Sequence, residues 1–317
     1  MEMNKKELRI VFMGTPSFAV ESLRALVENG YNVVGVITAP DKPAGRGYKF
    51  QPPAVKEYAL SAGLPVLQPE NLKNEVFLSE LKRLQADIQV VVAFRMLPEV
   101  VWSMPPMGTF NLHASLLPQY RGAAPINWAL INGEKETGVT TFFLKHEIDT
   151  GEIIFQEKVP IGENDNAETL HDHLMMLGAR LVLKTIDAVI TGTVQSLPQS
   201  ELITEEKELR PAPKIHKETC RINWDRPVQE IHNFVRGLSP YPAAWTEFEV
   251  GGEKMNFRIF TTKASPEAHQ LRPGEIVTDN KTTLRVAAQD GFIDILDIQL
   301  SGKRRMKTGD FLNGFSF

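Results

Sequence analysis

The hydrophobic positions at the start of the chain form two short uninterrupted runs with a helical pattern between them. The run Leu8–Met13 ends in Gly14-Thr15-Pro16, the helical pattern extends from there to Asn29-Gly30, and the second run is Val33–Ile37. This order predicts a strand, a helix and a second strand, joined by the right-handed crossover of a parallel sheet. Because Asn and Gly are common just beyond the last turn of a helix, Asn29-Gly30 is the expected helix end.

Apolar runs of the same kind return over the next hundred residues. Runs that are apolar at nearly every position are typical of strands buried on both faces, and a helical period over Glu168–Ile190 predicts one long helix after them. We therefore predict an α/β domain built on a Rossmann-like, doubly wound, mostly parallel sheet. The later runs are Ile88–Phe94, Gly108–Leu112 and Val139–Leu144.

The pattern changes after residue 190. Gly, Thr, Gln, Ser, Pro and charged residues replace the apolar periodicity as far as Pro213, which favours a linker. A short helical pattern at Val228–Arg236 follows, and then alternating segments separated by turns, which predict a small β-barrel or sandwich. We expect a first domain over residues 1–190, a linker over 191–208 and a C-terminal domain over 209–317. The alternating segments are Ala244–Val250, Asn256–Thr262, Gly274–Val277, Thr283–Ala287 and Gly291–Leu300.

The composition agrees with two globular domains. The 317 residues are 42% hydrophobic and 23% charged, which suits a chain that buries a core, and the length favours two domains. Cys220 is the only cysteine, so the chain forms neither an internal disulfide nor a Cys₄ or Cys₂His₂ metal site. The N-terminus lacks the apolar stretch of a signal peptide, and no run reaches the roughly 18 apolar residues of a membrane span. We expect a cytoplasmic protein without a membrane partner.

The charges are unevenly distributed along the chain. The net charge of −4 does not mark a nucleic-acid binder. Residues 208–317, however, hold 16 Lys and Arg against 14 Asp and Glu, whereas the preceding residues hold 19 against 25. This distribution permits a polyanionic partner on the C-terminal part without requiring one.

Two patterns that suggest cofactors fail on closer inspection. The first strand–helix turn, Gly14-Thr15-Pro16-Ser17, lacks the three-glycine spacing of a dinucleotide site, and Pro16 fixes φ where that fingerprint needs a flexible backbone. His171-Asp172-His173 superficially resembles a metal site. Histidines two residues apart on a helix point to different faces, so we expect no metal there.

The clearest chemistry follows the apolar run at residues 108–112. Asn111 and His113 are two residues apart, so in a strand they face the same way, at the strand end where open α/β sheets bind ligands. Asp149, in the polar loop after Val139–Leu144, reaches His113 if the two strands are neighbours. Taken singly, each of these residues is more often an ordinary hydrogen-bonded polar residue than a catalyst, and Asp149-Thr150-Gly151 is more often only a turn.

The surrounding residues make the combination far more specific. The stretch NLHASLLPQYRGAAPINWAL (residues 111–130), followed by Asp149-Thr150-Gly151 after one strand, resembles the signature of the folate-dependent formyltransferases. The loop DKPAGRGYK (residues 41–49) and residues 214–246 resemble the branch of that family that formylates methionyl-initiator tRNA. The resemblance covers nearly the whole chain, from about Leu8.

The resemblance implies both a reaction and a second domain. A formyl group would pass from 10-formyltetrahydrofolate, a co-substrate, to the α-amino group of methionyl-initiator tRNA for translation initiation, and no metal would be needed. The C-terminal domain would be the family's OB-like barrel, which supports the tRNA. We expect the enzyme to act as a monomer.

The resemblance also implies roles for single residues. Asn111, His113 and Asp149 match the catalytic residues of the family. A folate-contacting turn is implied at Ser115, Leu116, Leu117 and Pro118, and a basic finger that contacts tRNA is implied at Lys42, Arg46 and Lys49. Residues 93–98 and His146-Glu147 depart from the usual family residues at the corresponding positions.

Two other functions stay open at this stage. One is a formyltransferase that acts on a small amine, such as a phosphoribosyl glycinamide or an amino-sugar nucleotide. The loop around Arg46 and residues 214–246 favour tRNA over such an acceptor. The other is a non-catalytic tRNA-binding protein of the same fold. The presence of Asn111, His113 and Asp149 together argues against it.

Overall fold

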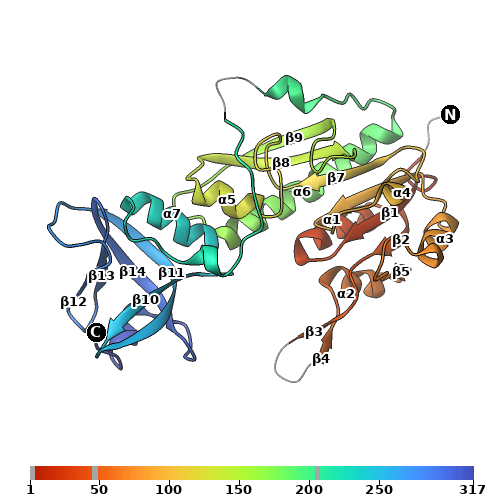
Figure 1. The fold of residues 1–317 in the computed structure, drawn as a ribbon. Coiled ribbons are helices and arrows are strands. Elements are labelled where there is room, and N and C mark those ends of the chain that lie inside the picture. The colour runs from red at the N-terminus through yellow and green to blue at the C-terminus, as the bar shows by residue number, and fades with distance from the viewer. Residues whose placement is uncertain (1–3, 45–48, 204–207) are drawn as a thin grey trace. The chain divides into compact units, whose positions relative to one another are not determined.

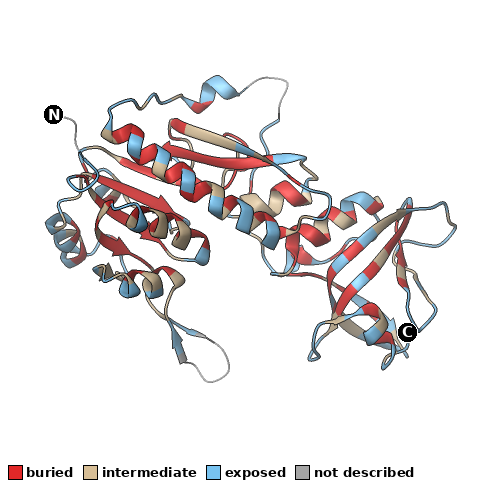
Figure 2. Cartoon of the chain, turned by 180° about the vertical axis from the view of Figure 1, so that it is seen from behind, coloured by how far each residue is buried: buried red, intermediate tan, exposed pale blue. Residues whose placement is uncertain are grey.

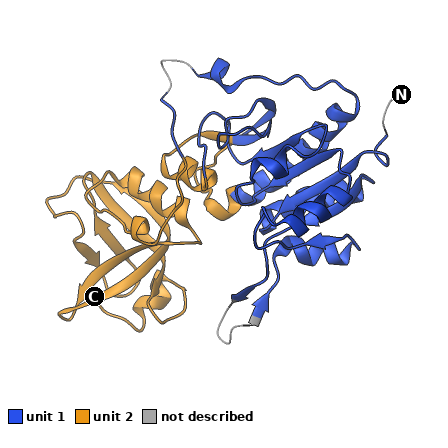
Figure 3. Ribbon diagram, turned by 45° about the vertical axis from the view of Figure 1, so that its right-hand side comes forward, with its two compact units in different colours: residues 1–122, 138–159, 171–211 blue, residues 123–137, 160–170, 212–317 orange. Residues whose placement is uncertain are grey.

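Two compact units make up the chain in this computed structural model, which describes residues 4–44, 49–203 and 208–317 (Figures 1 and 3). One unit holds the chain up to Gly122 together with residues 138–159 and 171–211. The other holds residues 123–137, 160–170 and 212–317. Two inner segments of the first half thus belong, by their contacts, with the C-terminal unit. The expected domain boundaries at 190 and 208 stay a prediction about which pieces fold independently.

The first unit is built on a seven-stranded sheet with the order β5-β2-β1-β6-β7-β8-β9. The strands from β5 to β7 pair in parallel, and β8 pairs antiparallel with β7. This confirms the predicted Rossmann-like, mostly parallel sheet. The strands are β1 (Arg9–Gly14), β2 (Asn32–Ile37), β5 (Val66–Leu67), β6 (Ile88–Val92), β7 (Thr109–His113), β8 (Glu136–Phe143) and β9 (Ile153–Pro160).

Helices pack on the faces of this sheet. Figure 2 shows the strands buried along most of their length, whereas the long helix α6 alternates between buried and exposed residues. A Cβ added to Gly178 of α6 would lie 2.6 Å from Cδ2 of Leu112, so Leu112 points toward that helix. Asn111 and His113 alternate with Leu112 and therefore face away from α6. The helices of the first half are α1 (Ser17–Glu28), α2 (Ala54–Ser61), α3 (Glu75–Arg83), α4 (Glu99–Trp102), α5 (Pro125–Ile131) and α6 (Ala167–Ile190).

The segment predicted to be a linker carries ordered structure where it is described. Leu197 forms an antiparallel bridge with Ile153 of β9, and the short helix η1 (Gln199–Leu202) follows. Gln119 pairs with the far end of the segment, because its amide donates to the Glu208 carbonyl and accepts from the Arg210 N–H. The composition predicted a linker, and partly buried hydrogen bonds and the bridge to β9 attach its described residues to the first unit.

The C-terminal unit contains a six-stranded sheet, with β15 paired to β14 beside the main order β10-β11-β14-β13-β12. The strands of this sheet pair antiparallel, which agrees with the predicted OB-like fold. Phe257, Ile259 and Ile293 fill its core together with Val235 of α7. The elements are α7 (Val228–Leu238), β10 (Ala244–Val250), β11 (Glu253–Pro266), β12 (Ile276–Thr278), β13 (Leu284–Ala287), β14 (Gly291–Leu300), β15 (Met306–Lys307) and α8 (Thr308–Leu312).

Within the described parts of the chain, none of the helices combines the length and apolar character that crossing a bilayer demands.

Candidate active site

His113 is held at the end of β7 with one ring nitrogen committed to a backbone group. Only 7% of the residue is exposed, and Nε2 lies 2.8 Å from the carbonyl oxygen of Tyr120. A carbonyl oxygen only accepts, so Nε2 carries the proton of this hydrogen bond. Nδ1 therefore faces the rest of the site, and it lies 4.0 Å from Oδ2 of Asp149.

Asp149 reaches His113 because the loop between β8 and β9 folds back to it. Its backbone has φ +55°, in the left-handed region that few residues other than glycine adopt. Its side chain is 11% exposed, and Oδ2 accepts a hydrogen bond of 3.0 Å from the Gly122 N–H. At 4.0 Å, the carboxylate and Nδ1 of His113 are too far apart for a direct hydrogen bond. A group with two N–H or O–H hydrogens placed between them could donate one hydrogen bond to Nδ1 and one to the carboxylate.

Asn111 precedes His113 by two residues on the same face of β7. The residue is half-buried, and its Oδ1 is buried without a hydrogen-bond partner among the described residues. A buried polar atom without a partner costs about 1–3 kcal/mol. Such atoms are rare in folded proteins, and this one lies on the same face of β7 as His113, two residues away.

The predicted folate-contacting turn is tightly held by its neighbours. Ser115 is fully buried and its hydroxyl donates to the Gln119 carbonyl, while Leu117 is 2% exposed. Thr140 accepts from the Leu117 N–H and donates to the Ser115 carbonyl. Pro118 is buried, and Leu116 is the one residue of the turn that is partly exposed. Folate contact at Ser115, Leu116, Leu117 and Pro118 stays a prediction, and the exposures give Leu116 the most accessible side chain.

The predicted tRNA finger forms a hairpin of β3 (Lys42–Ala44) and β4 (Lys49–Gln51), which the sequence pattern did not predict. Figure 1 shows it extending away from the sheet. Lys42 is exposed, Lys49 lies in β4, and Arg46 lies outside the described residues. Asp41 anchors the base of the hairpin through Nζ of Lys56 at 2.7 Å and Nε2 of Gln68. The bonds from Gln68 and Lys56 hold the pKa of the Asp41 carboxyl below its usual range.

The two departures from the family pattern lie on the surface of the first unit. His146 lies 3.3 Å from Glu99 and packs edge-on against Trp102, so this loop rests on α4. Arg95 donates to the backbone carbonyls of Pro69 and Glu70. Both residues thus make contacts that fasten neighbouring loops to one another.

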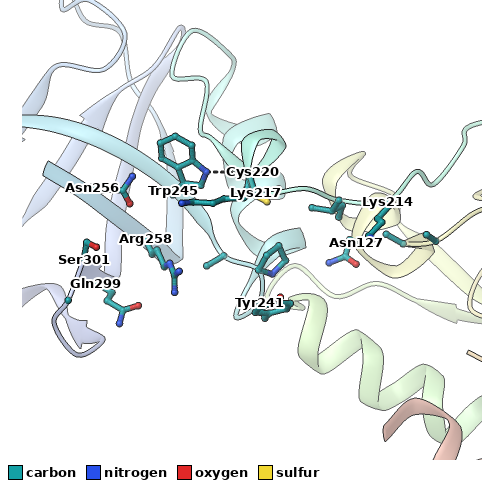
Figure 4. Close-up of a pocket in the computed structure, with 16 residues that line it drawn as sticks. Asn127, Lys214, Lys217, Cys220, Tyr241, Trp245, Asn256, Arg258, Gln299 and Ser301 are labelled. Atoms are coloured by element: carbon teal, nitrogen blue, oxygen red, sulfur yellow. Dashed lines mark hydrogen bonds between the residues drawn. The ribbon is translucent and has the colours of Figure 1, made fainter. Parts of the chain in front are cut away.

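A separate basic pocket lies within the C-terminal unit (Figure 4). Its volume is about 750 Å³, and the cations Lys214, Lys217 and Arg258 line it together with amide side chains and the exposed ring of Tyr241. None of the three cations forms a salt bridge with a described residue. Such a pocket is suited to an anion. The sequence showed the lysines but gave no sign that Arg258 of β11 would join them.

Metal ligands are not clustered anywhere in the described ranges, where no group of three or more His, Cys, Asp or Glu residues is placed to hold an ion.

Comparison with known proteins identifies the family to which these features belong. Residues 8–186 match the formyl transferase family, and residues 214–316 match the formyl transferase C-terminal domain. The chain belongs to the formyl transferase family. This formyl transferase is 63% identical over 314 residues to a protein of Bacteroides fragilis named methionyl-tRNA formyltransferase, with 99% of this chain and 97% of that protein covered. A protein of the same name in Flavobacterium johnsoniae is 51% identical, with 98% of both chains covered.

Solved structures of distant relatives share the fold of this formyl transferase. The N-formyltransferase of Helicobacter canadensis, in complex with folinic acid and dTDP-3-aminofucose, superposes with a TM-score of 0.66 at 23% identity. The match covers 94% of this chain and all of that one. HypX of Aquifex aeolicus, in complex with tetrahydrofolic acid, gives a TM-score of 0.63 at 19% identity, with 97% of this chain and 48% of that one covered.

Proposed function

We propose that this formyl transferase moves the formyl group of 10-formyltetrahydrofolate to the α-amino group of methionyl-initiator tRNA. The product would be N-formylmethionyl-tRNA, used for translation initiation in the cytoplasm. The names of relatives at 51–64% identity support the acceptor. The observation that carries the chemistry is the 4.0 Å approach of His113 to Asp149, with Asn111, whose Oδ1 has no partner among the described residues, on the same face of β7 as His113.

The folate co-substrate supplies an activated formyl carbon, and the attacking amine must lose a proton as its new C–N bond forms. The ester bond of aminoacyl-tRNA withdraws electrons and lowers the pKa of the α-amine below the free value of about 8, so much of the amine is already neutral at pH 7. Nδ1 of His113 is positioned to accept the proton, because Nε2 is committed to Tyr120. Asp149 then stabilises the imidazolium and is itself held by Gly122.

Asn111 completes the site from the strand. Its buried oxygen accepts an N–H of the incoming amine, and its amide hydrogens donate to the negative charge that develops on the formyl oxygen. A donor aimed at a developing oxyanion typically lowers the activation barrier by about 3–4 kcal/mol. The proton taken up by His113 leaves toward the folate nitrogen as the old C–N bond breaks.

Two basic features support a tRNA acceptor over a small amine. Three cations that form no salt bridge with a described residue line one pocket of the C-terminal unit, and Lys42 is exposed on the β3–β4 hairpin. Arginine and lysine at such positions contact nucleic-acid phosphates and fix the register of the partner without reading its bases. A phosphoribosyl glycinamide or an amino-sugar nucleotide carries only a few phosphates, whereas a tRNA offers one phosphate per nucleotide to cations on both units.

A single-turnover assay with 10-formyltetrahydrofolate tests the proposal. We expect formylation of methionyl-initiator tRNA and none of glycinamide ribonucleotide or an amino-sugar nucleotide. If only a small amine were formylated, the proposed tRNA acceptor would be wrong. If tRNA bound but no product formed, the non-catalytic alternative would be favoured. Asp149→Asn, which keeps the size of the side chain, is the matched inactive control.

A further inference from the structure

The side chain of Gln199 uses all of its hydrogen-bonding capacity inside the first unit. It is 3% exposed and belongs to η1, in the segment whose composition resembles a linker. Its Oε1 accepts from Nε and Nη2 of Arg121, at 3.0 and 2.6 Å. Its Nε2 donates to the carbonyl oxygens of Asp149 and Gly151, at 2.7 and 2.8 Å. One amide thus joins two turns that are distant in sequence.

These two turns hold the reacting side chains. In the first turn, the Tyr120 carbonyl orients His113 and the Gly122 N–H holds the carboxylate of Asp149, with Arg121 between them. In the second turn, Asp149 presents the carboxylate itself. Gln199 is bonded to both turns through groups directly adjacent to these contacts, so it fixes the distance between His113 and Asp149 without touching either ring or carboxylate.

Both turns need such a restraint. Tyr120 has φ +59° and Asp149 has φ +55°, and residues other than glycine held in this region cost of order 1–3 kcal/mol each. Strained backbone persists only where its surroundings over-determine it. Tyr120 is further held by its own N–H, which donates to the Arg210 carbonyl at 2.7 Å. For Asp149, the bonds from Gln199 supply the corresponding restraint on the backbone.

We propose that Gln199 is a positioning residue for formyl transfer, locking the Tyr120–Gly122 turn to the Asp149–Gly151 turn at the separation that the proton transfer needs. The inference rests on the proposed function for its chemistry, but the lock itself is a property of the fold. Gln199 acts through Asp149 and His113, so its loss lowers kcat and leaves the KM values for folate and tRNA within about two-fold.

Two substitutions separate this role from simple packing. Gln199→Glu keeps the size and the acceptors for Arg121, but it places a carboxylate oxygen opposite the carbonyls of Asp149 and Gly151. Gln199→Met keeps the volume and removes all four bonds. Misplacement of a reacting group by about 1 Å costs roughly 10²-fold in rate, so we expect both variants to lose about 10- to 100-fold in kcat. Ser196→Ala is the matched control. Ser196 lies on the same segment but bonds to the side chain of Glu152, and kcat should stay within two-fold.

A double-variant comparison and hydrogen exchange complete the test. In an Asp149→Asn background, Gln199→Met should add less than a two-fold loss, because the group it positions is already gone. Amide exchange over residues 144–152 should rise at least ten-fold in both Gln199 variants while their Tm stays near the wild-type value. Wild-type kcat or unchanged exchange in Gln199→Glu, or additive losses with Asp149→Asn, would overturn the inference. An inactive wild-type enzyme would overturn the proposed function alone, because the exchange measurement still decides whether Gln199 holds the turn.

Discussion

At the scale of single residues, Asn111 shows the clearest conflict between stability and function. Its side chain stands half-buried on β7, where an apolar residue would pack without leaving a polar atom unsatisfied. A fold can retain such an atom when a ligand completes its hydrogen bond, and we propose the reacting amine as that ligand.

Substitution of Asn111 therefore separates activity from folding. Asn111→Ala should lower the single-turnover rate by about 10²–10³-fold, the usual effect of losing one oxyanion donor. Its free energy of unfolding should change by less than about 1 kcal/mol, since the lost packing is offset by removal of an unsatisfied oxygen.

Ser22 is the control for that prediction. Its hydroxyl is also buried without a partner among the described residues, but it lies on α1 rather than on β7, the strand of Asn111 and His113. Ser22→Ala should leave the rate unchanged. The rate is measured by single-turnover kinetics and the free energy of unfolding by urea denaturation. An equal loss of rate in Asn111→Ala and Ser22→Ala would contradict the role given to Asn111.

The predictability of the site differs from residue to residue. Asn111 and His113 follow from the two-residue period of a strand, which places them on one face whatever the tertiary structure is. Asp149 was expected near His113 only if the two strands were neighbours, and the β7–β8 pairing supplies that condition. Gln199 could not be predicted, because its role depends on contacts 50 and 78 residues away and its surroundings read as polar coil.

At the scale of elements, the turn between β8 and β9 depends on a close backbone approach at Gly151. A Cβ there would lie 1.5 Å from the carbonyl oxygen of Phe143. The glycine is needed for space rather than for a left-handed φ, since the tight approach is what brings Asp149 back over β7. Sequence alone shows an Asp-Thr-Gly turn but not this contact. The β3–β4 hairpin could not be predicted either, because strands of three residues each are too short to show an alternating pattern.

Helix α7 carries a histidine that links the stability of the C-terminal unit to pH. Burial and the nearby charge of Arg236 lower the pKa of His232, whose Nδ1 pairs with Thr262 of β11. The folded state therefore prefers neutral His232. The contribution of neutral His232 to the free energy of unfolding is complete above the histidine pKa of the unfolded chain, about 6.5. It is lost as the pH falls below that value, because the unfolded chain binds the proton more readily.

Replacement of this histidine should flatten the pH dependence. Between pH 7.5 and pH 5.5 the wild-type protein should lose more free energy of unfolding than His232→Gln does, measured by urea denaturation. Equal losses in the two proteins would show that His232 does not titrate between the folded and unfolded states in this range.

At the scale of the whole molecule, the sequence predicted both classes of structure, and the expected domain boundaries at 190 and 208 stay a prediction. Continuous apolar runs and short alternating segments distinguished a mostly parallel sheet from an antiparallel one. Residues 123–137 and 160–170 associate with the C-terminal unit through tertiary contacts such as Arg236 with the carbonyls of Gly162 and Asp165. The pattern of apolar and polar residues along the sequence does not show which distant residues will be in contact.

The basic pocket predicts how the molecule responds to salt when it binds tRNA. Each neutralised phosphate contributes roughly 0.7–0.9 to the slope of log K against log salt concentration. Combined replacement of Lys214, Lys217 and Arg258 by Ala should reduce the magnitude of that slope by about two to three and leave the folate Kd unchanged.

Arg272→Ala is the control for this measurement, because Arg272 is exposed and already bonded to Glu275. It should leave the slope as in the wild type. A slope unaffected by the triple replacement would remove the pocket from the tRNA-binding surface.

The attachment of the segment after α6 sets a limit on how far the enzyme can be shortened. A fragment that stops at Ile190 would retain every strand of the large sheet and all three reacting side chains. It would lack the Gln199 amide and the carbonyls of Glu208 and Arg210 that grip Gln119 and Tyr120. If these residues have the roles proposed above, we expect a fragment with an assembled catalytic centre to extend at least to Arg210, twenty residues beyond the end of α6 at Ile190.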